Sequence, residues 1–132
     1  MREQQEQKKS ITVLSDVSLI ACIVQRGQGD DIVSAAQDAG AQGATIYFAR
    51  GTGVRERLGI LGVAIEVEKA VVNIIAANDQ VDRIFEHLYV VAELETPGRG
   101  LMYVTPLEKA ATYIPVDVLE KLERDGQIVD AY

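Results

Sequence analysis

The segment of residues 49–59 gathers side chains that could bind an anion. It reads ARGTGVRERLG, with three glycines and three arginines in eleven residues, and it directly follows the β-like run ATIYF. Glycine lets the backbone turn without steric cost, and arginine holds oxyanions through paired hydrogen bonds. Three interpretations follow: a phosphate-binding loop, a surface that docks on another protein, or a solvated turn.

A second glycine-rich stretch, PGRG at 97–100, could cradle a phosphate group. Gly98 and Gly100 would let successive amides point into one concavity and let a phosphate approach the backbone closely. Arg99 could then bind the anion through two hydrogen bonds. An ordinary turn between a helix and a strand has the same composition, so the stretch taken alone is also explained as a plain connection.

Arg50, Arg55 and Arg57 could supply further positive charge to such a site. In an extended segment Arg55 and Arg57 project to one side and Glu56 to the other. A solvated surface whose charges neutralise one another is the alternative. The neighbouring apolar run LGILGVAI favours a charged rim around an apolar tip, which suits protein docking. The predicted docking residues are Arg55, Arg57, Leu58, Ile60 and Leu61.

The sequence lacks the common motifs of enzymes. No lysine follows the glycines as in a P-loop, there is no nucleophile elbow, and nothing sets Glu66 or Glu68 against a nucleophile. The one histidine, His87, and the one cysteine, Cys22, make no metal-binding constellation. We therefore predict a non-enzymatic protein, with weak nucleotide hydrolysis as an open alternative, in which Cys22 is a packing residue.

Composition bounds the class of protein. The chain has 132 residues, of which 48% are hydrophobic, and a net charge of −7. It is therefore expected to be globular, and its negative charge argues against broad nucleic-acid binding while permitting a small anionic ligand at a local basic cluster. No stretch has the length of a membrane span, and the first ten residues lead into no signal-peptide core, so we expect a cytoplasmic protein.

Hydrophobic patterning predicts four strands and three helices. The strands are 17–24, 43–49, 69–77 and 101–107. The first helix is capped by Asp30 or Asp31 and ends at Gly40. The second, 78–94, is capped by Asn78 or Asp79, and its buried stripe is Val81, Ile84, Phe85 and Leu88. The third, 116–126, follows Pro115.

This order of elements, βαβ–loop–βαβ, predicts an α+β, ferredoxin-like fold with both helices on one face of a four-stranded antiparallel sheet. We expect residues 1–15 to be a flexible leader and 16–132 a single domain. The other face of the sheet is bare, and oligomerisation is the common way to cover it. The excursion 54–68 is too long for a tight turn, so it carries function or is mobile, unless GVAIEV merely extends the third strand.

With these elements, the long excursion after the second strand, and TPGRGLMYV before the fourth, the chain resembles a divergent branch of the P-II signal-transduction proteins over roughly residues 17–115. The resemblance implies a homotrimer whose sheets face inward and which binds adenine nucleotides (ATP, ADP or AMP) between subunits. It also implies that the long loop, called the T-loop, changes shape with the ligand and docks on a target, often a membrane transport protein. Magnesium and 2-oxoglutarate join ATP in many members.

The resemblance also assigns ligand-binding residues. GAT, with Gly43 and Thr45, looks like the segment that holds the adenine, and the PGRG stretch resembles the family's phosphate-cradling B-loop. The remaining matches lie at the two bases of the T-loop and past the fourth strand. The ligand-binding residues implied in this way are Gly43, Thr45, Gly51, Gly53, Lys69, Gly98, Arg99, Gly100 and Lys109.

The chain departs from the nitrogen regulators at several ligand positions. Leu101 stands where they have a B-loop lysine, and Thr112 and Ile114 stand where they have phosphate-binding arginines. Arg55 replaces the glutamine that coordinates magnesium, and the shorter T-loop lacks the modified tyrosine. These departures argue against 2-oxoglutarate binding and covalent modification, and they leave magnesium uncertain. Nucleotide binding stays the expectation, with altered phosphate contacts.

Several alternatives stay open at this point. Related branches are compatible with ADP, ATP, AMP, a cyclic nucleotide, or bicarbonate beside a nucleotide, and the target protein is not identified. A trimer of the CutA kind would have the same fold, although one histidine and one cysteine make a poor site for a soft metal. A nucleotide-hydrolysing enzyme is the other competing class.

Overall fold

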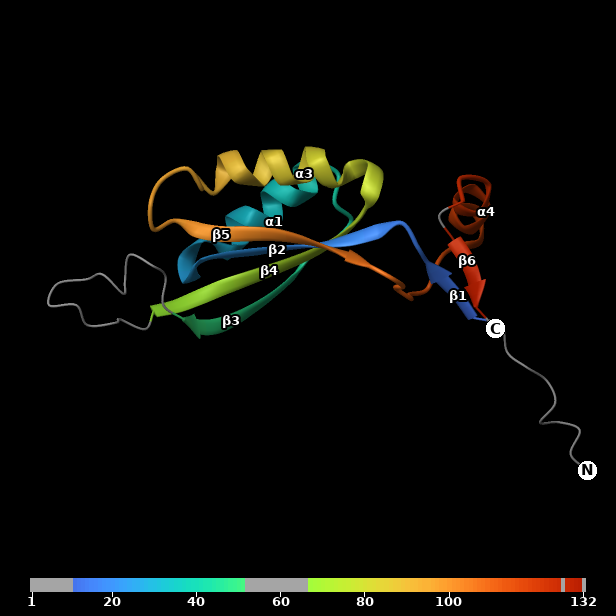
Figure 1. Ribbon diagram of the computed structural model, residues 1–132, viewed down its shortest axis with the longest axis horizontal. Coiled ribbons are helices and arrows are strands. Elements are labelled where there is room, and N and C mark those ends of the chain that lie inside the picture. The colour runs from blue at the N-terminus through green and yellow to red at the C-terminus, as the bar shows by residue number, and fades with distance from the viewer. Residues whose placement is uncertain (1–10, 52–66, 127, 132) are drawn as a thin grey trace, which may run out of the picture. The chain divides into compact units, whose positions relative to one another are not determined.

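The structure, a computed structural model, describes residues 11–51, 67–126 and 128–131 (Figure 1). The strands are β1 (Ile11–Leu14), β2 (Val17–Gln25), β3 (Thr45–Gly51), β4 (Val67–Ala77), β5 (Gly100–Leu107) and β6 (Ile128–Ala131). The helices are the 3-10 turn η2 (Arg26–Gln28), α1 (Gly29–Asp38), α3 (Asn78–Val91) and α4 (Val116–Arg124). All four predicted strands and all three predicted helices are therefore present. Contacts divide the chain into two compact units, Ser18–Thr105 and a unit that joins Met1–Val17 to Pro106–Tyr132.

The larger unit contains a four-stranded sheet in the order β3-β4-β2-β5. Strands β3 and β4 are antiparallel, and their register runs from Thr45 opposite Asn73 to Gly51 opposite Val67. Helices α1 and α3 cover one face of the sheet (Figure 1). This arrangement confirms the predicted ferredoxin-like α+β fold, in which each helix crosses over the sheet between two strands.

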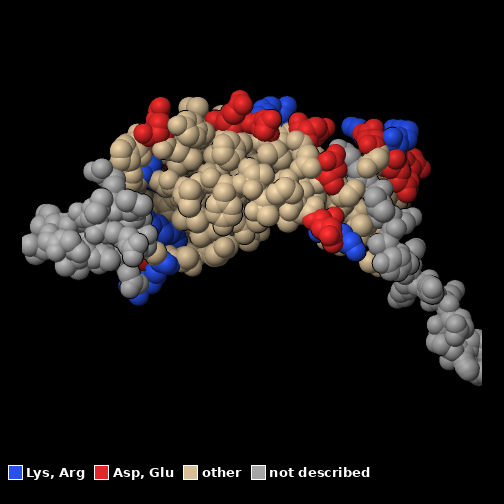
Figure 2. Space-filling view, viewed as in Figure 1, with Lys and Arg blue, Asp and Glu red and all other residues tan. Residues whose placement is uncertain are grey.

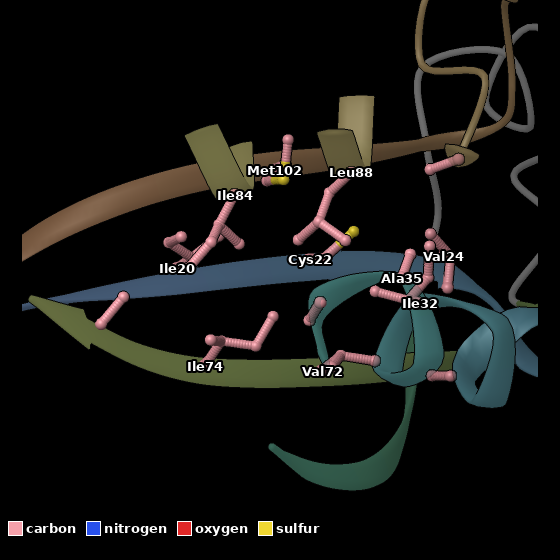
Figure 3. Packing of buried hydrophobic residues seen from close by; sticks show 14 of the residues in the cluster. Ile20, Cys22, Val24, Ile32, Ala35, Val72, Ile74, Ile84, Leu88 and Met102 are labelled. Atoms are coloured by element: carbon pink, nitrogen blue, oxygen red, sulfur yellow. The ribbon is translucent and has the colours of Figure 1, made fainter. Parts of the chain in front are cut away.

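The hydrophobic core lies between this face of the sheet and the two helices (Figure 3). Alternate residues of each strand enter it, because side chains of a strand point to opposite faces in turn. From the predicted stripe of α3, Val81, Ile84 and Leu88 are buried, and Phe85 packs against the core in a half-buried position. The other buried members of the core are Ile20, Cys22, Val24, Ile32, Ala35, Ala36, Ala70, Val72, Ile74, Ala76, Ala92 and Met102.

Cys22 is a free thiol within this core, as the sequence predicted. Burial raises the pKa of the Cys22 thiol to about 11, because the thiolate would lose its hydration in the apolar core. A thiol with such a raised pKa is a weak nucleophile at neutral pH. Cys22 therefore contributes packing to the fold.

The starts of α1 and α3 differ from the predicted caps. Neither helix has a side-chain cap: the residue before α1 is Gln28 and the residue before α3 is Ala77. Asn78 is instead the first residue of α3, and its side-chain oxygen accepts a hydrogen bond of 2.5 Å from the Ser18 hydroxyl. A partner 60 residues away in the sequence has overridden the local capping preference. Asp30 and Asp31 lie in the first turn of α1, where negative charge favours the helix dipole.

The opposite face of the sheet carries exposed apolar side chains. Tyr47 of β3, Ile75 of β4, and Leu101 and Tyr103 of β5 are all between 46% and 59% exposed. They alternate with the core residues along their strands, which places them on the face that the helices do not cover. The prediction of a bare sheet face therefore holds within the residues that the structure describes.

The smaller unit contains a two-stranded sheet and α4. Strands β1 and β6 are antiparallel, with Ile11 opposite Ala131 and Leu14 opposite Ile128. Leu14 and Ala110 also exchange two backbone hydrogen bonds of 2.7 and 3.1 Å. The predicted flexible leader of residues 1–15 is therefore wrong for Ile11–Leu14, because a partner strand at the far end of the chain orders them. Residues 1–10 lie outside the described residues.

That residues 16–132 form a single domain stays a prediction. Helix α4 begins at Val116 directly after Pro115, as the sequence predicted. None of the helices in the described ranges is long and apolar enough to cross a membrane.

Candidate functional site

Four strand ends converge at one end of the four-stranded sheet. Strands β2 and β3 end there, and β4 and β5 begin there (Figure 1). An ion pair of 2.5 Å joins Arg26, directly after β2, to Glu68 near the start of β4. The Gln25 side chain donates a 3.5 Å hydrogen bond to the carbonyl of Gly98, which ties the loop before β5 to the end of β2. We refer to this region as the basic end of the sheet.

Five of the predicted ligand-binding residues lie at the basic end. Gly51 is the last residue of β3, and Lys69 is the third residue of β4 and makes an interaction of its own. Gly98 and Arg99 lie in the loop before β5, and Gly100 is the first residue of that strand. The fold therefore brings together residues that are up to 49 positions apart in the sequence.

The loop that follows α3 is a series of closed turns. Glu93 and Leu94 donate hydrogen bonds of 3.1 and 3.2 Å to the carbonyls of Val90 and Tyr89, which is the Schellman arrangement of a helix end. Hydrogen bonds of 2.9 Å from Thr96 to the Glu93 carbonyl and of 3.3 Å from Arg99 to the Thr96 carbonyl continue the chain of turns. An unbroken series of backbone hydrogen bonds thus connects Arg99 to the end of α3.

Glycine is required at residue 100 for a reason that the sequence did not show. A β-carbon at this residue would collide with the backbone carbonyl oxygen of Ile23 in β2, and would lie 3.2 Å from a methyl group of Val24. The φ angle of Gly100 is +156°. The sequence predicted that this glycine admits a phosphate, whereas the structure shows that it also lets β5 pack against β2.

The Arg99 side chain is mostly buried but incompletely paired. It is 27% exposed, and its Nη2 atom lies 3.8 Å from Oε2 of Glu93. Its Nε atom is buried and finds no hydrogen-bond acceptor in the described parts of the chain. A buried donor without an acceptor is costly, so this guanidinium is suited to receive an oxyanion.

Arg26 is a member of this region that the sequence analysis missed. Besides its ion pair with Glu68, its guanidinium lies over the ring of Phe48, 4.8 Å from the centroid. Arg50 stands directly opposite Glu68 in the β3–β4 ladder. The sequence feature that could have indicated Arg26 is its position directly after a buried central strand, at the same end of the sheet as the two candidate loops.

Charge is distributed unevenly over the larger unit. Arg26, Arg50, Lys69 and Arg99 lie at the basic end. Acidic side chains gather instead along the side of the molecule that the helices cover (Figure 2). Arg83, on α3, instead donates a 3.1 Å hydrogen bond to the Ala39 carbonyl at the end of α1. A local excess of basic residues on an acidic protein attracts anions to that end.

Of the other predicted residues, Gly43 and Thr45 lie away from the basic end of their own chain. Gly43 and Thr45 lie before and at the start of β3, at the far end of that strand from Gly51 and about 20 Å away for seven extended residues. Lys109 belongs to the smaller unit. Gly53 and the docking residues Arg55, Arg57, Leu58, Ile60 and Leu61 lie outside the described residues. Within the ranges described, no cluster of three metal-ligating side chains occurs.

The fold and this site define a ferredoxin-like domain with a glycine-bounded basic loop before the last strand of its four-stranded sheet. The family model described as nitrogen regulatory protein P-II matches residues 17–114. The chain therefore belongs to the P-II family, whose members are signalling proteins. The resemblance found in the sequence is thereby confirmed.

A solved structure supports the same fold. The chain is similar to PII of Arabidopsis thaliana, crystallised bound to citrate, with 23% sequence identity and a TM-score of 0.57 over 71% of this chain and 79% of that one. At this level of identity the likeness concerns the fold. A comparison with curated proteins found no match.

Substitution of Gly100 tests the packing that positions the loop. We expect Gly100→Ala to lower the free energy of unfolding by about 1–3 kcal/mol, because the new methyl group must displace backbone of β2. Gly43→Ala is the matched control, since a β-carbon there would meet no atom within 4 Å, and its effect should stay within about 0.5 kcal/mol. Urea unfolding measures both, and equal stability of the two variants would contradict the assignment.

Proposed function

We propose that this chain is a P-II signalling protein that binds an adenine nucleotide at the basic end of the sheet and reports the bound ligand to a partner protein. The observation that supports the proposal best is the Arg99 guanidinium, whose buried Nε lacks an acceptor among the described residues. A phosphate group would provide oxygens for two parallel hydrogen bonds from arginine. Membership of the P-II family favours ATP, ADP or AMP as the compound that carries this phosphate.

The positive charge of the basic end supports an anionic ligand over a neutral one. The position of the B-loop lysine is occupied by Leu101, and Arg99 would supply the positive charge in its stead. Arg26 and Arg50 add charge at the same sheet end. Glu68, the ionic partner of Arg26, balances part of that charge. Phosphate contacts would therefore differ from those of the nitrogen regulators, and magnesium would be needed less where arginines neutralise the phosphates.

The site that we propose is completed by a second copy of the chain. Gly43 and Thr45 lie at the opposite end of β3 from Gly51, so one chain alone cannot join them to the loop before β5. The exposed apolar face formed by Tyr47, Ile75, Leu101 and Tyr103 gives copies a reason to associate, because burial of such a face is favourable. We propose a homotrimer, with nucleotide clefts between neighbouring subunits to which Lys69 and Lys109 also contribute.

The partner in this proposal is a membrane transport protein that binds the docking residues between Arg55 and Leu61. Arg55 and Arg57 would form the charged rim of the contact, and the apolar tip that follows them would be buried in it. The protein would thus act in the cytoplasm and reach the membrane through its partner. A nucleotide can control this docking only if it binds the docked and undocked forms with different affinity.

Light scattering tests the homotrimer. At micromolar concentration we expect three times the chain mass of 14.4 kDa. Tyr103→Lys places a charge on the exposed sheet face and should lower the mass, whereas Val90→Lys, on a side chain of α3 that is 70% exposed, should leave it unchanged. A stable wild-type monomer would contradict both the trimer and the shared cleft.

Calorimetric titration tests the ligand. Wild type should bind at least one of ATP, ADP, AMP and a cyclic nucleotide, each measured with and without magnesium, bicarbonate and 2-oxoglutarate. Arg99→Gln should weaken binding by about tenfold or more, because a hydrogen bond to a charged group contributes about 1.5–3 kcal/mol. Arg99→Lys, which keeps the charge and loses the fork, should lie between the two. Unchanged affinity in Arg99→Gln would remove this residue from the site.

A pull-down from cell membranes tests the partner. We expect wild type to capture a transport protein in amounts that change with nucleotide, and Arg55→Glu/Arg57→Glu to lose it, because charge reversal opposes docking. The double variant should bind nucleotide normally if these residues serve docking alone. Equal capture by both proteins, with and without nucleotide, would contradict the proposed docking role.

A further inference from the structure

The loop before β5 contains its own counterion for Arg99. Glu93 follows the end of α3, and its carboxylate Oε2 lies 3.8 Å from Nη2 of Arg99. The turns between the two residues close on each other, since Thr96 donates to the Glu93 carbonyl and Arg99 donates to the Thr96 carbonyl. The carboxylate and the guanidinium are therefore held near each other by backbone structure.

The backbone of Glu93 is unusually fixed for a residue in a loop. Its φ angle is +54°, in the left-handed region that glycine usually occupies at the end of a helix. Its amide donates to the Val90 carbonyl, and the next amide closes the helix end on Tyr89. The corresponding position after α1 is Gly40, with φ +108°. Gly40 shows that this helix-ending motif needs no side chain at this position. After α3 the same position is a glutamate, which adds a carboxylate.

The geometry makes Glu93 a competitor for the guanidinium and not the group that positions it. At 3.8 Å the contact is too long for a hydrogen bond. The Glu93 side chain is 62% exposed, whereas that of Arg99 is 27% exposed and its Nε is buried. Packing therefore orients Arg99, and the carboxylate rests against its accessible edge, where a ligand's oxyanion would form shorter and paired hydrogen bonds.

We propose that Glu93 sets the affinity of the site, as an internal carboxylate that a ligand's oxyanion must displace from Arg99. The inference rests on the proposed function, and it adds a residue of this chain that determines the strength of anion binding. Glu93 lowers affinity through repulsion of the incoming oxyanion and through competition for the Arg99 donors. Its removal should therefore strengthen binding, the opposite of what loss of a ligand-contacting or positioning residue would cause.

The test compares Glu93→Gln with Glu95→Gln in the full-length protein. Glu95 is an exposed carboxylate of the same loop, so its removal changes the net charge equally. In calorimetric titration with ATP and ADP, Glu93→Gln should bind about two- to fivefold more tightly than wild type, the range that exposed ion pairs cover. Glu95→Gln should change affinity less. The gain should disappear when Glu93→Gln is combined with Arg99→Gln, because the competition needs the guanidinium.

The outcomes separate this inference from the proposed function. Binding by wild type with unchanged or weaker affinity in Glu93→Gln, or with an equal gain in Glu95→Gln, would overturn the inference and leave the nucleotide site standing. If wild type binds no nucleotide, the proposed ligand is wrong. The competition is then measured with inorganic phosphate, followed by the amide resonances of Gly98 and Gly100. Tighter phosphate binding by Glu93→Gln, and not by Glu95→Gln, would still support the inference about Glu93. The lack of such a gain would overturn the inference.

Discussion

A β-carbon at residue 100 would collide with the backbone carbonyl of Ile23, and the position of β5 beside β2 depends on its absence. This contact fixes where the loop that follows α3 must end. Because the same loop begins at the closed helix end of Glu93 and Leu94, both of its ends are determined by packing and hydrogen bonds. The backbone position of Arg99, the residue before Gly100, is therefore fixed as well.

Side-chain contacts join Arg99 and its loop to the other members of the basic end of the sheet. Gln25 binds the Gly98 carbonyl, and the next residue, Arg26, forms an ion pair with Glu68 and lies over Phe48. The ends of β2, β3, β4 and β5 are thus connected by side chains as well as by the sheet. The cations that gather there contrast with acidic helix surfaces, so the local field attracts anions although the whole chain carries a charge of −7. Glu93 moderates that attraction at Arg99.

Much of the fold could be predicted from the sequence because its signals are local. The continuous apolar run of β2 indicates a buried strand, and the helical spacing of Val81, Ile84 and Leu88 indicates a buried helix face. The start of α3 could not be predicted in this way, since the Asn78 side chain accepts a hydrogen bond from Ser18, 60 residues away in the sequence. The pairing of β1 with β6 was equally hidden, because the two strands come from opposite ends of the chain.

The candidate site was predictable in its loop and not in its surroundings. The composition of PGRG indicated Gly98, Arg99 and Gly100, but the need for glycine at residue 100 arises from a strand that is distant in the sequence. The parts played by Arg26 and Glu93 likewise depend on contacts that only the folded chain creates. Gly43 and Thr45 lie apart from this loop within one chain, so their assignment still rests on the resemblance.

In the proposed function, Arg99 and the turn around it receive the phosphate of a nucleotide. A residue-resolved NMR titration of the full-length protein with ATP, ADP and AMP tests this role most directly. We expect the strongest changes at the amides of Gly98, Arg99 and Gly100 and at the Nε–H of Arg99, with saturation at a common ligand concentration. Saturable binding that leaves these four signals unchanged, or the absence of binding by all three nucleotides, would contradict it.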